Sequence, residues 1–200
     1  MPLRHIPSAA GADEAGRGPL AGPVVAAAVI LPRRFNLDGI DDSKKLDRAK
    51  REHLEVRIKK HAAWSVVVAE VDEVDRLNIL WASMAAMHRA VAQLEKPFKK
   101  VLIDGNTLPK EIPWLAEAVV DGDAKIACIA AASILAKTER DRIMTRLASD
   151  YPVYGFERHF GYSTPEHLEA LRIHGPCAIH RRSFQRIKEW YDQPCLIFAE

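Results

Sequence analysis

Acidic residues stand at the ends of three short apolar segments of the chain. The segments and their acidic ends are residues 9–12 with Asp13-Glu14, residues 101–103 with Asp104, and residues 118–120 with Asp121-Gly122-Asp123. Carboxylates at the edge of an apolar core are costly unless something compensates their charge. One such residue could cap a helix or close a turn, but three in one chain suggest that they converge on a cation.

The chemistry of these side chains indicates which cation they would bind. All-oxygen sites favour hard ions such as Mg²⁺ or Mn²⁺, and the histidines and cysteines show no zinc-binding pattern. Two such ions about 3.5–4 Å apart activate a water and stabilise the leaving oxygen in phosphodiester hydrolysis. The residues alone therefore favour a metal-dependent phosphodiesterase, with simple caps and turns as the alternative.

The pair Asp13 and Glu14 raises a geometric problem, because neighbours on a regular strand point to opposite faces. We expect both to reach one site only if the strand ends there, which the following Gly16 and Gly18 allow. The same Gly16-Arg17-Gly18 segment can bring backbone N–H groups close to a ligand. Beside a metal centre it is a candidate for recognising sugar and phosphate, and the alternative is a tight turn with a surface arginine.

The elements that must position these residues follow from periodicity and turn signals. The sequence predicts strands at 9–12 and 24–31 joined by a turn over 16–23, a helix from Asp42 or Ser43 to Lys60, a strand at 64–71, a helix at 78–94, strands at 101–103 and 118–120, a helix from 124 to about 149 opened by Asp123, and helices starting at Thr164-Pro165 and at Ser183. This order predicts a mixed α/β chain with one central sheet.

Length and composition agree with one globular domain spanning residues 1–200 of the 200-residue chain. The net charge of +2 does not by itself imply nucleic acid. Apolar runs are too short for a membrane span and the first residues lack a signal-peptide pattern, so a cytoplasmic protein is expected. Cys128, Cys177 and Cys195 are expected to be reduced thiols, with Cys128 in the core. The basic segment 180–188 is expected to be a solvated helix face.

Several motifs resemble those of bacterial ribonuclease HII, in the order of that family and from about Gly11 to Phe184. They are Asp13–Val24 (DEAGRGPLAGPV), Asp42–Leu46 (DSKKL), Asp104-Gly105-Asn106, Gly122-Asp123, Ala131–Lys137 (AASILAK), Tyr154-Gly155-Phe156, Gly161–Thr164 (GYST) and His180–Phe184 (HRRSF). The resemblance implies a ribonuclease-H-like five-stranded mixed sheet flanked by helices. It also implies a core of about residues 8–150 and a helical C-terminal extension of about 151–190.

The resemblance also implies roles for individual residues. Asp13, Glu14, Asp104 and Asp123 match the metal-binding and catalytic carboxylates, whereas Asp121 does not match. Gly16, Arg17 and Gly18 match the loop that recognises the ribonucleotide 2′-OH, the group that separates RNA from DNA. Tyr162 matches the tyrosine that stacks on the sugar of the following deoxynucleotide, and a buried tyrosine is the alternative. Lys44 and Ser133 lie in motifs that are expected to touch phosphate.

The implied reaction is Mg²⁺- or Mn²⁺-dependent hydrolysis of the RNA strand of RNA–DNA hybrids. It includes cutting on the 5′ side of ribonucleotides embedded in duplex DNA, which leaves 3′-OH and 5′-phosphate ends and serves ribonucleotide removal from DNA. One position departs from the family, because Phe160 stands where lysine is common. A basic contact to the substrate is expected to be lost there.

Other functions stay open at this point. A junction resolvase or integrase on the same fold would use similar carboxylates, but would leave Gly16–Gly18 and Tyr162 without a role. A non-catalytic nucleic-acid-binding module would suit the basic segment, but the carboxylates would repel its ligand unless metal is bound. Ribonuclease HIII is set aside, because it is expected to have an additional N-terminal domain and a loop that differs from Gly16-Arg17-Gly18. The tail 193–200 loosely resembles a sliding-clamp-binding peptide, and a packed or disordered tail is the alternative.

Overall fold

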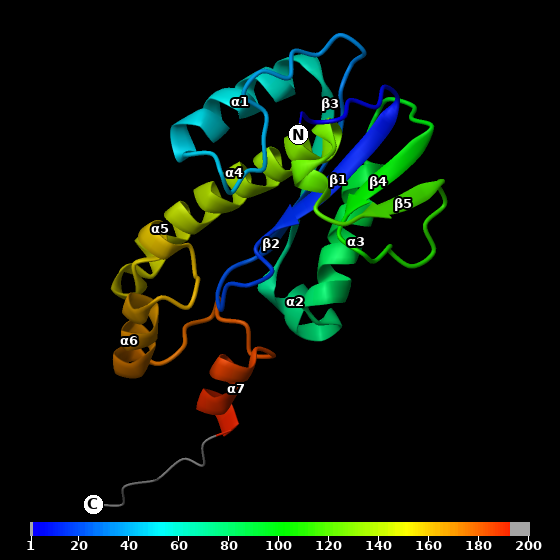
Figure 1. The fold of residues 1–200 in the computed structure, drawn as a ribbon. Helices are drawn as coiled ribbons and strands as arrows, with labels where there is room; N and C mark the ends of the chain where they lie inside the picture. Colours follow the sequence, from blue (N-terminus) through cyan, green and yellow to red (C-terminus); the bar gives the residue numbers. More distant parts are fainter. Residues whose placement is uncertain (1, 193–200) are drawn as a thin grey trace, which may run out of the picture.

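The computed structural model describes residues 2–192. A five-stranded mixed sheet forms its centre, with strand order β3-β2-β1-β4-β5 (Figure 1). The strands are β1 (Ala9–Ala15), β2 (Val24–Ile30), β3 (Ala63–Ala69), β4 (Lys100–Asp104) and β5 (Ala116–Val119). Strands β1, β2 and β3 pair antiparallel, whereas β4 runs parallel to both β1 and β5. The predicted fold class is confirmed.

The helices depart from their predicted bounds at several points. They are α1 (Arg48–His61), α2 (Val71–Leu77), α3 (Ile79–Ala92), α4 (Ala127–Asp150), α5 (Phe156–His159), α6 (Pro165–His174) and α7 (Gln185–Asp192), with short 3-10 turns η1 (Gly122–Ala124) and η2 (Pro152–Tyr154). The prediction that the first helix starts at Asp42 or Ser43 is wrong, because Asp47 caps α1 and accepts a hydrogen bond from the Lys50 N–H. The α2 and α5 helices were not predicted, and the strand expected to run to Val71 ends at Ala69.

The start of the long helix α4 also differs from the prediction. Asp123 does not cap this helix but lies within η1, and α4 follows Ile126 without a side-chain cap. Residue 123 is thereby released from a capping role and lies at the turn after β5. This change matters for the site, because a carboxylate that caps a helix is occupied by backbone N–H groups.

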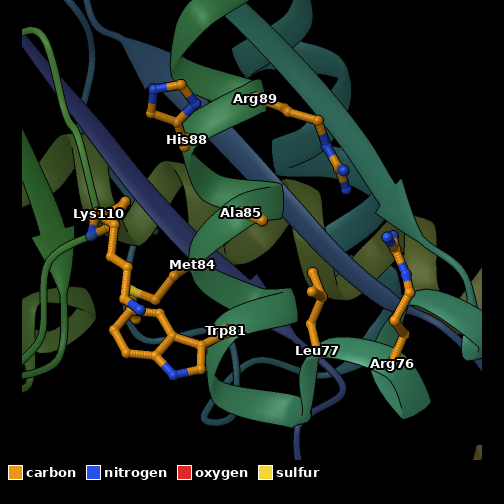
Figure 2. Close-up of a pocket in the computed structure, with 9 residues that line it drawn as sticks. Arg76, Leu77, Trp81, Met84, Ala85, His88, Arg89 and Lys110 are labelled. Carbon is orange, nitrogen blue, oxygen red and sulfur yellow. The ribbon is translucent and has the colours of Figure 1, made fainter.

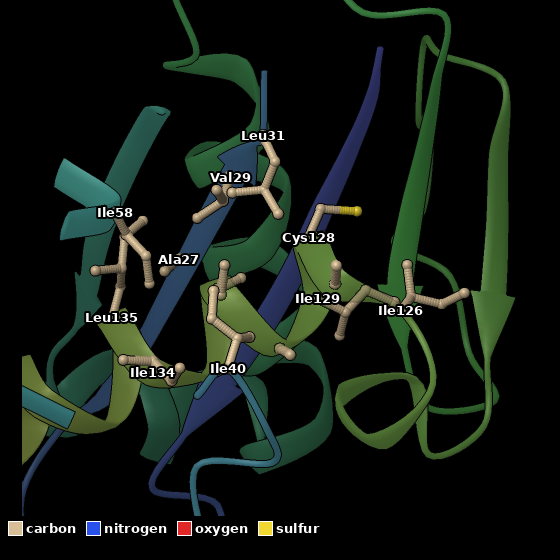
Figure 3. Close-up of a cluster of buried hydrophobic side chains, with 14 of the residues drawn as sticks. Ala27, Val29, Leu31, Ile40, Ile58, Ile126, Cys128, Ile129, Ile134 and Leu135 are labelled. Atoms are coloured by element: carbon tan, nitrogen blue, oxygen red, sulfur yellow. The ribbon is translucent and has the colours of Figure 1, made fainter. Parts of the chain in front are cut away.

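Helices α1 and α4 cover one face of the sheet. Their apolar side chains pack on the odd-numbered residues of β2, such as Val25, Ala27 and Val29, in a fully buried cluster (Figure 3). Small residues bring α4 close to β1: a Cβ atom on Gly11 would overlap the backbone of Cys128 and Ile129. Cys128 is buried in this core, as predicted. The nearly all-apolar first half of α4 is therefore what fixes β1, and with it Asp13.

Helix α3 covers the opposite face of the sheet. Met84, Met87 and Val91 of α3 pack against the even-numbered residues of β2 and β1. Asn78 begins the helix, and its side chain accepts hydrogen bonds from the N–H groups of Leu80 and Trp81. Trp81 and Trp114 are partly buried against this cluster, whereas Trp64 of β3 is 39% exposed.

The C-terminal extension packs on the far end of α4 and on the loop between β1 and β2. Its apolar cluster joins Leu20 and Ala21 of that loop to Met144, Phe156 and Leu171. His159, His167 and His180 of this extension are all buried. Arg181 was predicted to be part of a solvated helix face and is also fully buried. Within residues 2–192, no helix is long and apolar enough to cross a membrane. The tail 193–200, with Cys195 and the clamp-like sequence, lies outside the described residues.

Candidate active site

One cavity of about 230 Å³ opens beside the carboxyl end of β1. It gathers residues that are far apart in the sequence: Asp13, Glu14, Ala15, Gly16, Arg17, Gly18, Ser43, Lys44, Asp104, Ser133, Lys137 and Tyr162. Nine of the ten residues singled out in the sequence therefore line one cavity. The tenth, Asp123, is linked to it through Lys44, whose Nζ lies 3.4 Å from Asp123 Oδ2.

Parallel strands explain why Asp13 and Asp104 meet. The β1 and β4 strands run side by side from Ala9–Lys100 to Ala12–Ile103, so the next residue of each is an aspartate at the same sheet edge. Asp104 Oδ1 accepts hydrogen bonds from the Gly122 N–H at 2.7 Å and from the Asp123 N–H at 3.4 Å. Asp104 thus fixes the turn that carries Asp123.

The expectation that β1 ends at Asp13 is wrong, because the strand continues to Ala15 while still pairing with β2. Its pairing with β4 stops at Ala12, so beyond that residue the β4 side of β1 is open. We attribute the shared site to this open edge. Asp13 lies on the α4 side, beside Ser133, and Glu14 lines the same cavity. Adjacent residues therefore serve one site without a break in the strand.

The carboxylates repel one another in the absence of a cation. Burial, followed by the charges of Glu14 and Asp104, raises the pKa of Asp13 well above its ordinary value. Burial also raises the pKa of Glu14, against the opposing effect of Arg17, and that of Asp123, against the opposing effect of Lys44. A cluster in which burial and neighbouring negative charge both disfavour ionisation is typical of a functional site.

These carboxylates form an incomplete cage. Within residues 2–192, no three His, Cys, Asp or Glu side chains are close enough together to hold an ion by themselves. Mg²⁺ does not require such a cage, since it commonly binds through one or two carboxylates and takes water and substrate phosphate for the rest. The all-oxygen donor set and the unbalanced negative charge on buried Asp13 both fit a hard divalent cation.

Lys44 and Ser133 reach the cavity from opposite sides. Residues 42–46 form turns before α1, and Lys44 is pinned there because its N–H donates to Asp42 Oδ1 at 2.9 Å. The hydroxyl groups of Ser43 and Ser133 are 2.9 Å apart and join this turn to α4. The turn thus holds one lysine directly above the carboxylates, with most of its side chain exposed.

The glycine loop (residues 16–23) and the tyrosine loop (residues 159–164) contact one another beside the cavity. A Cβ atom on Gly18 would lie 3.6 Å from Cε1 of Tyr162. The ring of Tyr162 is 43% exposed, so the alternative of a buried tyrosine is wrong. Lys137 Nζ lies 5.7 Å from the centre of that ring. Arg17 turns toward the carboxylates, with Nη1 at 3.4 Å from Glu14 Oε1.

Two residues beneath the cavity were missed in the sequence. Arg140 of α4 and Arg181 of the extension are fully buried and donate to backbone carbonyl groups of the glycine loop. Arginines in charged helical or basic segments ordinarily face solvent, and the residues on either side of these two gave no contrary signal. Their role depends on long-range contacts that only the folded chain reveals.

Another hollow, of about 480 Å³, lies against the outer side of α3 (Figure 2). It is lined by Trp81 and Met84 together with cations, including Lys110, whose Nζ lies 4.3 Å from the centre of the Trp81 ring. No carboxylate lines it. Because α3 covers the sheet face opposite α4, this hollow is separate from the candidate active site.

Comparison with known proteins shows which family the chain resembles. The family model described as Ribonuclease HII matches residues 10–187. The chain is 57% identical over 181 residues to ribonuclease HII of Marinomonas sp. (strain MWYL1), covering 90% of this chain and 91% of that protein. It is 58% identical over 176 residues to ribonuclease HII of Dechloromonas aromatica (strain RCB), covering 87% and 89%.

Solved structures show the same fold. The chain superposes on RNase HII in its PCNA complex from Archaeoglobus fulgidus with a TM-score of 0.74 at 26% identity, covering 94% of this chain and 98% of that one. Ribonuclease H2 from Pyrococcus horikoshii gives 0.74 at 27% identity, covering 91% and 96%. Bst-RNase HIII with Mn²⁺ gives 0.71 at 18% identity, covering 92% and 69%, and shares the fold. Matched across both its sheet and its C-terminal extension, the chain belongs to the ribonuclease HII family.

Proposed function

We propose that this ribonuclease HII cuts on the 5′ side of single ribonucleotides embedded in duplex DNA, as well as within the RNA strand of RNA–DNA hybrids. The coarser activity follows from the family, whose members are metal-dependent endonucleases of RNA in such hybrids. The observation that carries the finer proposal is the placement of Gly18 opposite the Tyr162 ring, at the rim of the cavity that holds Asp13 and Asp104.

The carboxylates would hold the metal, and Mg²⁺ or Mn²⁺ fits their oxygen ligands. When bound, divalent ions lower the pKa of an attacking water and stabilise charge on the scissile phosphate. Asp13 and Glu14 are the central ligands in this proposal because both line the cavity and burial raises the pKa of both. Asp104 and Asp123 would contribute from the neighbouring strand and turn. We assign the catalytic role to all four.

The glycine and tyrosine loops would select the substrate. Gly16, Arg17 and Gly18 present backbone groups at the cavity wall, where they can hydrogen-bond a 2′-OH without reading the base. The exposed Tyr162 ring offers a flat apolar surface on which a deoxyribose packs, whereas a ribose 2′-OH would disturb this contact. The two loops together would mark the step from a ribonucleotide to a deoxynucleotide.

Lys44 and Ser133 are proposed to contact phosphate. Lys44 carries the positive charge nearest to Asp123 and is exposed enough to reach an incoming backbone. Ser133 lies at the cavity floor and is oriented by Ser43. Phosphate contacts of this kind position the strand and contribute affinity rather than sequence preference.

A panel of substrates tests the proposal. Labelled duplexes with one ribonucleotide, with a full RNA strand, with DNA only, and with a four-way DNA junction are incubated with Mg²⁺, with Mn²⁺, or with EDTA. We expect metal-dependent cutting of the first two substrates only. Cutting of junction DNA without cutting of ribonucleotides would favour a resolvase-like enzyme. Binding without any cutting in metal would favour a nucleic-acid-binding module.

A sliding clamp is a proposed partner, acting through residues 193–200. The support is the Gln193-Pro194-Cys195-Leu196-Ile197-Phe198 sequence and the solved complex of the Archaeoglobus fulgidus relative with PCNA. A pull-down with a bacterial clamp should lose the protein when residues 193–200 are deleted. Equal capture of both forms would refute this partner assignment.

The DNA substrate implies activity where the chromosome lies, which in bacteria is the cytoplasm.

A further inference from the structure

Arg140 and Arg181 are both 0% exposed. Within residues 2–192 their guanidinium groups donate hydrogen bonds to backbone carbonyl groups and lie within 4.0 Å of no carboxylate oxygen. Moving a guanidinium out of water is costly unless its donors are matched by acceptors. Their acceptors therefore indicate what these two residues do.

Arg181 donates only to backbone carbonyl groups of the glycine loop. Its guanidinium contacts the oxygens of Gly16 at 2.7 Å, Pro19 at 2.8 Å and Gly22 at 2.9 Å. Longer bonds reach Arg17 and Pro23. The planar guanidinium of arginine has five N–H donors and can bind several carbonyl groups of a loop that surrounds it. The ammonium group of lysine has a single nitrogen.

Arg140 links the glycine loop to the tyrosine loop. Nε donates to Pro23 O at 3.0 Å, Nη2 to Ala21 O at 3.1 Å and Nη1 to Phe160 O at 3.0 Å. Its Cζ also lies 5.9 Å from the centre of the Tyr162 ring. The Arg140 fork therefore contacts both walls of the substrate cavity at once.

The two loops also interlock through their backbones. The Leu20 N–H donates to Gly161 O at 2.8 Å, and the Arg181 N–H donates to Leu20 O at 2.9 Å. Gly161 has φ +81°, and a Cβ atom there would lie 2.6 Å from Ala21 O. The tyrosine loop is pressed directly onto the glycine loop, with no side chain between them at this point.

We infer that Arg140 and Arg181 are positioning residues that hold Gly16–Gly18 and Tyr162 at a fixed separation, and so set the discrimination of an RNA-to-DNA junction. This inference rests on the proposed function. The ribose that carries the 2′-OH and the following deoxyribose are adjacent sugars of one strand. Two loops that each recognise one of these sugars must therefore lie at a fixed separation. Burial lowers the pKa of Arg140 to about 10 and that of Arg181 to about 9, and both stay cationic at neutral pH.

Lysine substitutions test the inference while keeping the charge. Arg140→Lys and Arg181→Lys are compared with Arg142→Lys and Arg182→Lys at nearby positions. The Arg142 side chain pairs with Glu55 and Glu139, and the Arg182 side chain lies over the Tyr191 ring. The readout is the ratio of kcat/KM on a single ribonucleotide in DNA to kcat/KM on a full RNA–DNA hybrid. We expect this ratio to fall by about tenfold or more in both Arg140→Lys and Arg181→Lys. A misplacement of about 1 Å in an active site can lower the reaction rate about a hundredfold.

An unchanged ratio in folded Arg140→Lys and Arg181→Lys, including equal losses of kcat/KM on both substrates, would overturn the inference. Those outcomes require a wild-type enzyme that cuts both substrates, and they leave the proposed function intact. A wild-type enzyme that cuts neither substrate refutes the proposed function itself, and with it the role inferred for the two arginines.

Hydrogen exchange gives a readout that needs no substrate. In the wild-type protein, residues 16–23 and residues 159–164 should lose their protection from exchange at the same denaturant concentration. Loss of protection at different concentrations would contradict the attachment of both loops to the two arginines. In Arg181→Lys, exchange should accelerate in both peptides, although this side chain donates only to the first. Acceleration confined to residues 16–23 would likewise count against the inference. The wild-type series serves even if a variant does not fold.

Discussion

Lys44 Nζ lies 3.4 Å from Asp123 Oδ2, so a protein cation already sits beside the proposed metal ligands. Burial lowers the pKa of Lys44, but the negative charges of Asp123 and Asp42 raise it by more, so the net shift is upward. In the metal-free protein the lysine partly neutralises a site that lacks its ion. A metal that binds Asp123 must compete with this contact.

Replacing Lys44 by methionine should therefore tighten metal binding while weakening catalysis. The lysine is largely exposed, so the gain is small, up to about fivefold in affinity. Titration calorimetry with Mn²⁺ measures the affinity, and steady-state cleavage measures the loss of the phosphate contact. Lys45→Met, which removes a neighbouring exposed lysine, is the control. Weaker Mn²⁺ binding in Lys44→Met would contradict this assignment.

Asp13→Asn should stabilise the metal-free protein. The pKa of Asp13 is raised on folding, so its contribution to stability is present at low pH and is lost as pH rises through the folded pKa. Above the ordinary pKa of an aspartate, the Asp13 carboxyl therefore opposes folding, and the neutral amide removes that cost. Thermal unfolding in EDTA should show a higher Tm, by about 2–4 °C for each kcal/mol relieved.

The same variant should lose the stabilisation that Mg²⁺ or Mn²⁺ gives to the wild type, because a ligand that binds only the folded state raises Tm. Asp121→Asn is the matched control, since Asp121 is exposed and pairs with Lys125. A lower Tm of Asp13→Asn in EDTA, or an unchanged response to metal, would argue against a repulsive metal site.

Acid should destabilise the protein through its buried histidines. His180 Nδ1 accepts a hydrogen bond from the Cys177 N–H at 2.9 Å, so its Nε2–H donates to His167 Nε2 at 3.0 Å. His167 Nδ1–H then donates to Tyr162 O at 2.9 Å. Only neutral rings satisfy this chain, and burial together with His167 lowers the pKa of His180 from 6.5 to about 4.

The unfolded chain gains a proton at His180 before the folded one, so stability falls as pH drops from about 6.5 to about 4. The loss is about 3 kcal/mol from this residue. Urea unfolding of His180→Asn across this range should show a shallower pH dependence than the wild type. His53→Gln, at an exposed position of α1, should keep the wild-type dependence. A slope unchanged in His180→Asn would exclude this origin of the acid sensitivity.

Phe160→Lys should strengthen nucleic-acid binding and make it more salt-dependent. Phe160 is on the tyrosine loop, its ring centre 5.1 Å from Lys137 Nζ, and a lysine there would add a phosphate contact. The slope of log K against log salt should steepen by about one. Fluorescence anisotropy with a cleavage-inactive Asp104→Asn background measures it. Val56→Lys, an equal charge change on exposed α1, should leave the slope nearly unchanged, and an equal effect of both would point to non-specific charge.

The sequence supplied most of the fold because apolar runs and turn residues act locally. The strands, α3, α6 and the convergence of Asp13 with Asp104 all follow from the order of apolar segments and their acidic ends. The start of α1 was misplaced because Asp42, Ser43 and Asp47 are all competent caps, and the Ser43–Ser133 contact that selects Asp47 spans 90 positions in the chain. The two buried arginines and three buried histidines escaped prediction because polar residues are buried only when distant partners satisfy them.

The site was predicted more fully than the geometry that holds it. Residue types and the family resemblance pointed to Asp13, Gly16–Gly18 and Tyr162, yet nothing in local spacing indicates that Gly18 faces Tyr162. That relationship depends on Gly161 resting against Ala21 and on the Arg140 bonds to both loops. Contacts between the first and last parts of a chain are set by tertiary packing, which periodicity does not encode.

The most direct test of the account is to map the cut in a DNA duplex that contains one ribonucleotide. Wild type and Asp104→Asn are incubated with this duplex in Mg²⁺ and in EDTA, and the product ends are identified. The account predicts a single Mg²⁺-dependent cut on the 5′ side of the ribonucleotide, with 3′-OH and 5′-phosphate ends, absent in Asp104→Asn. Cutting that persists in EDTA or in Asp104→Asn, or that ignores the ribonucleotide, would contradict it.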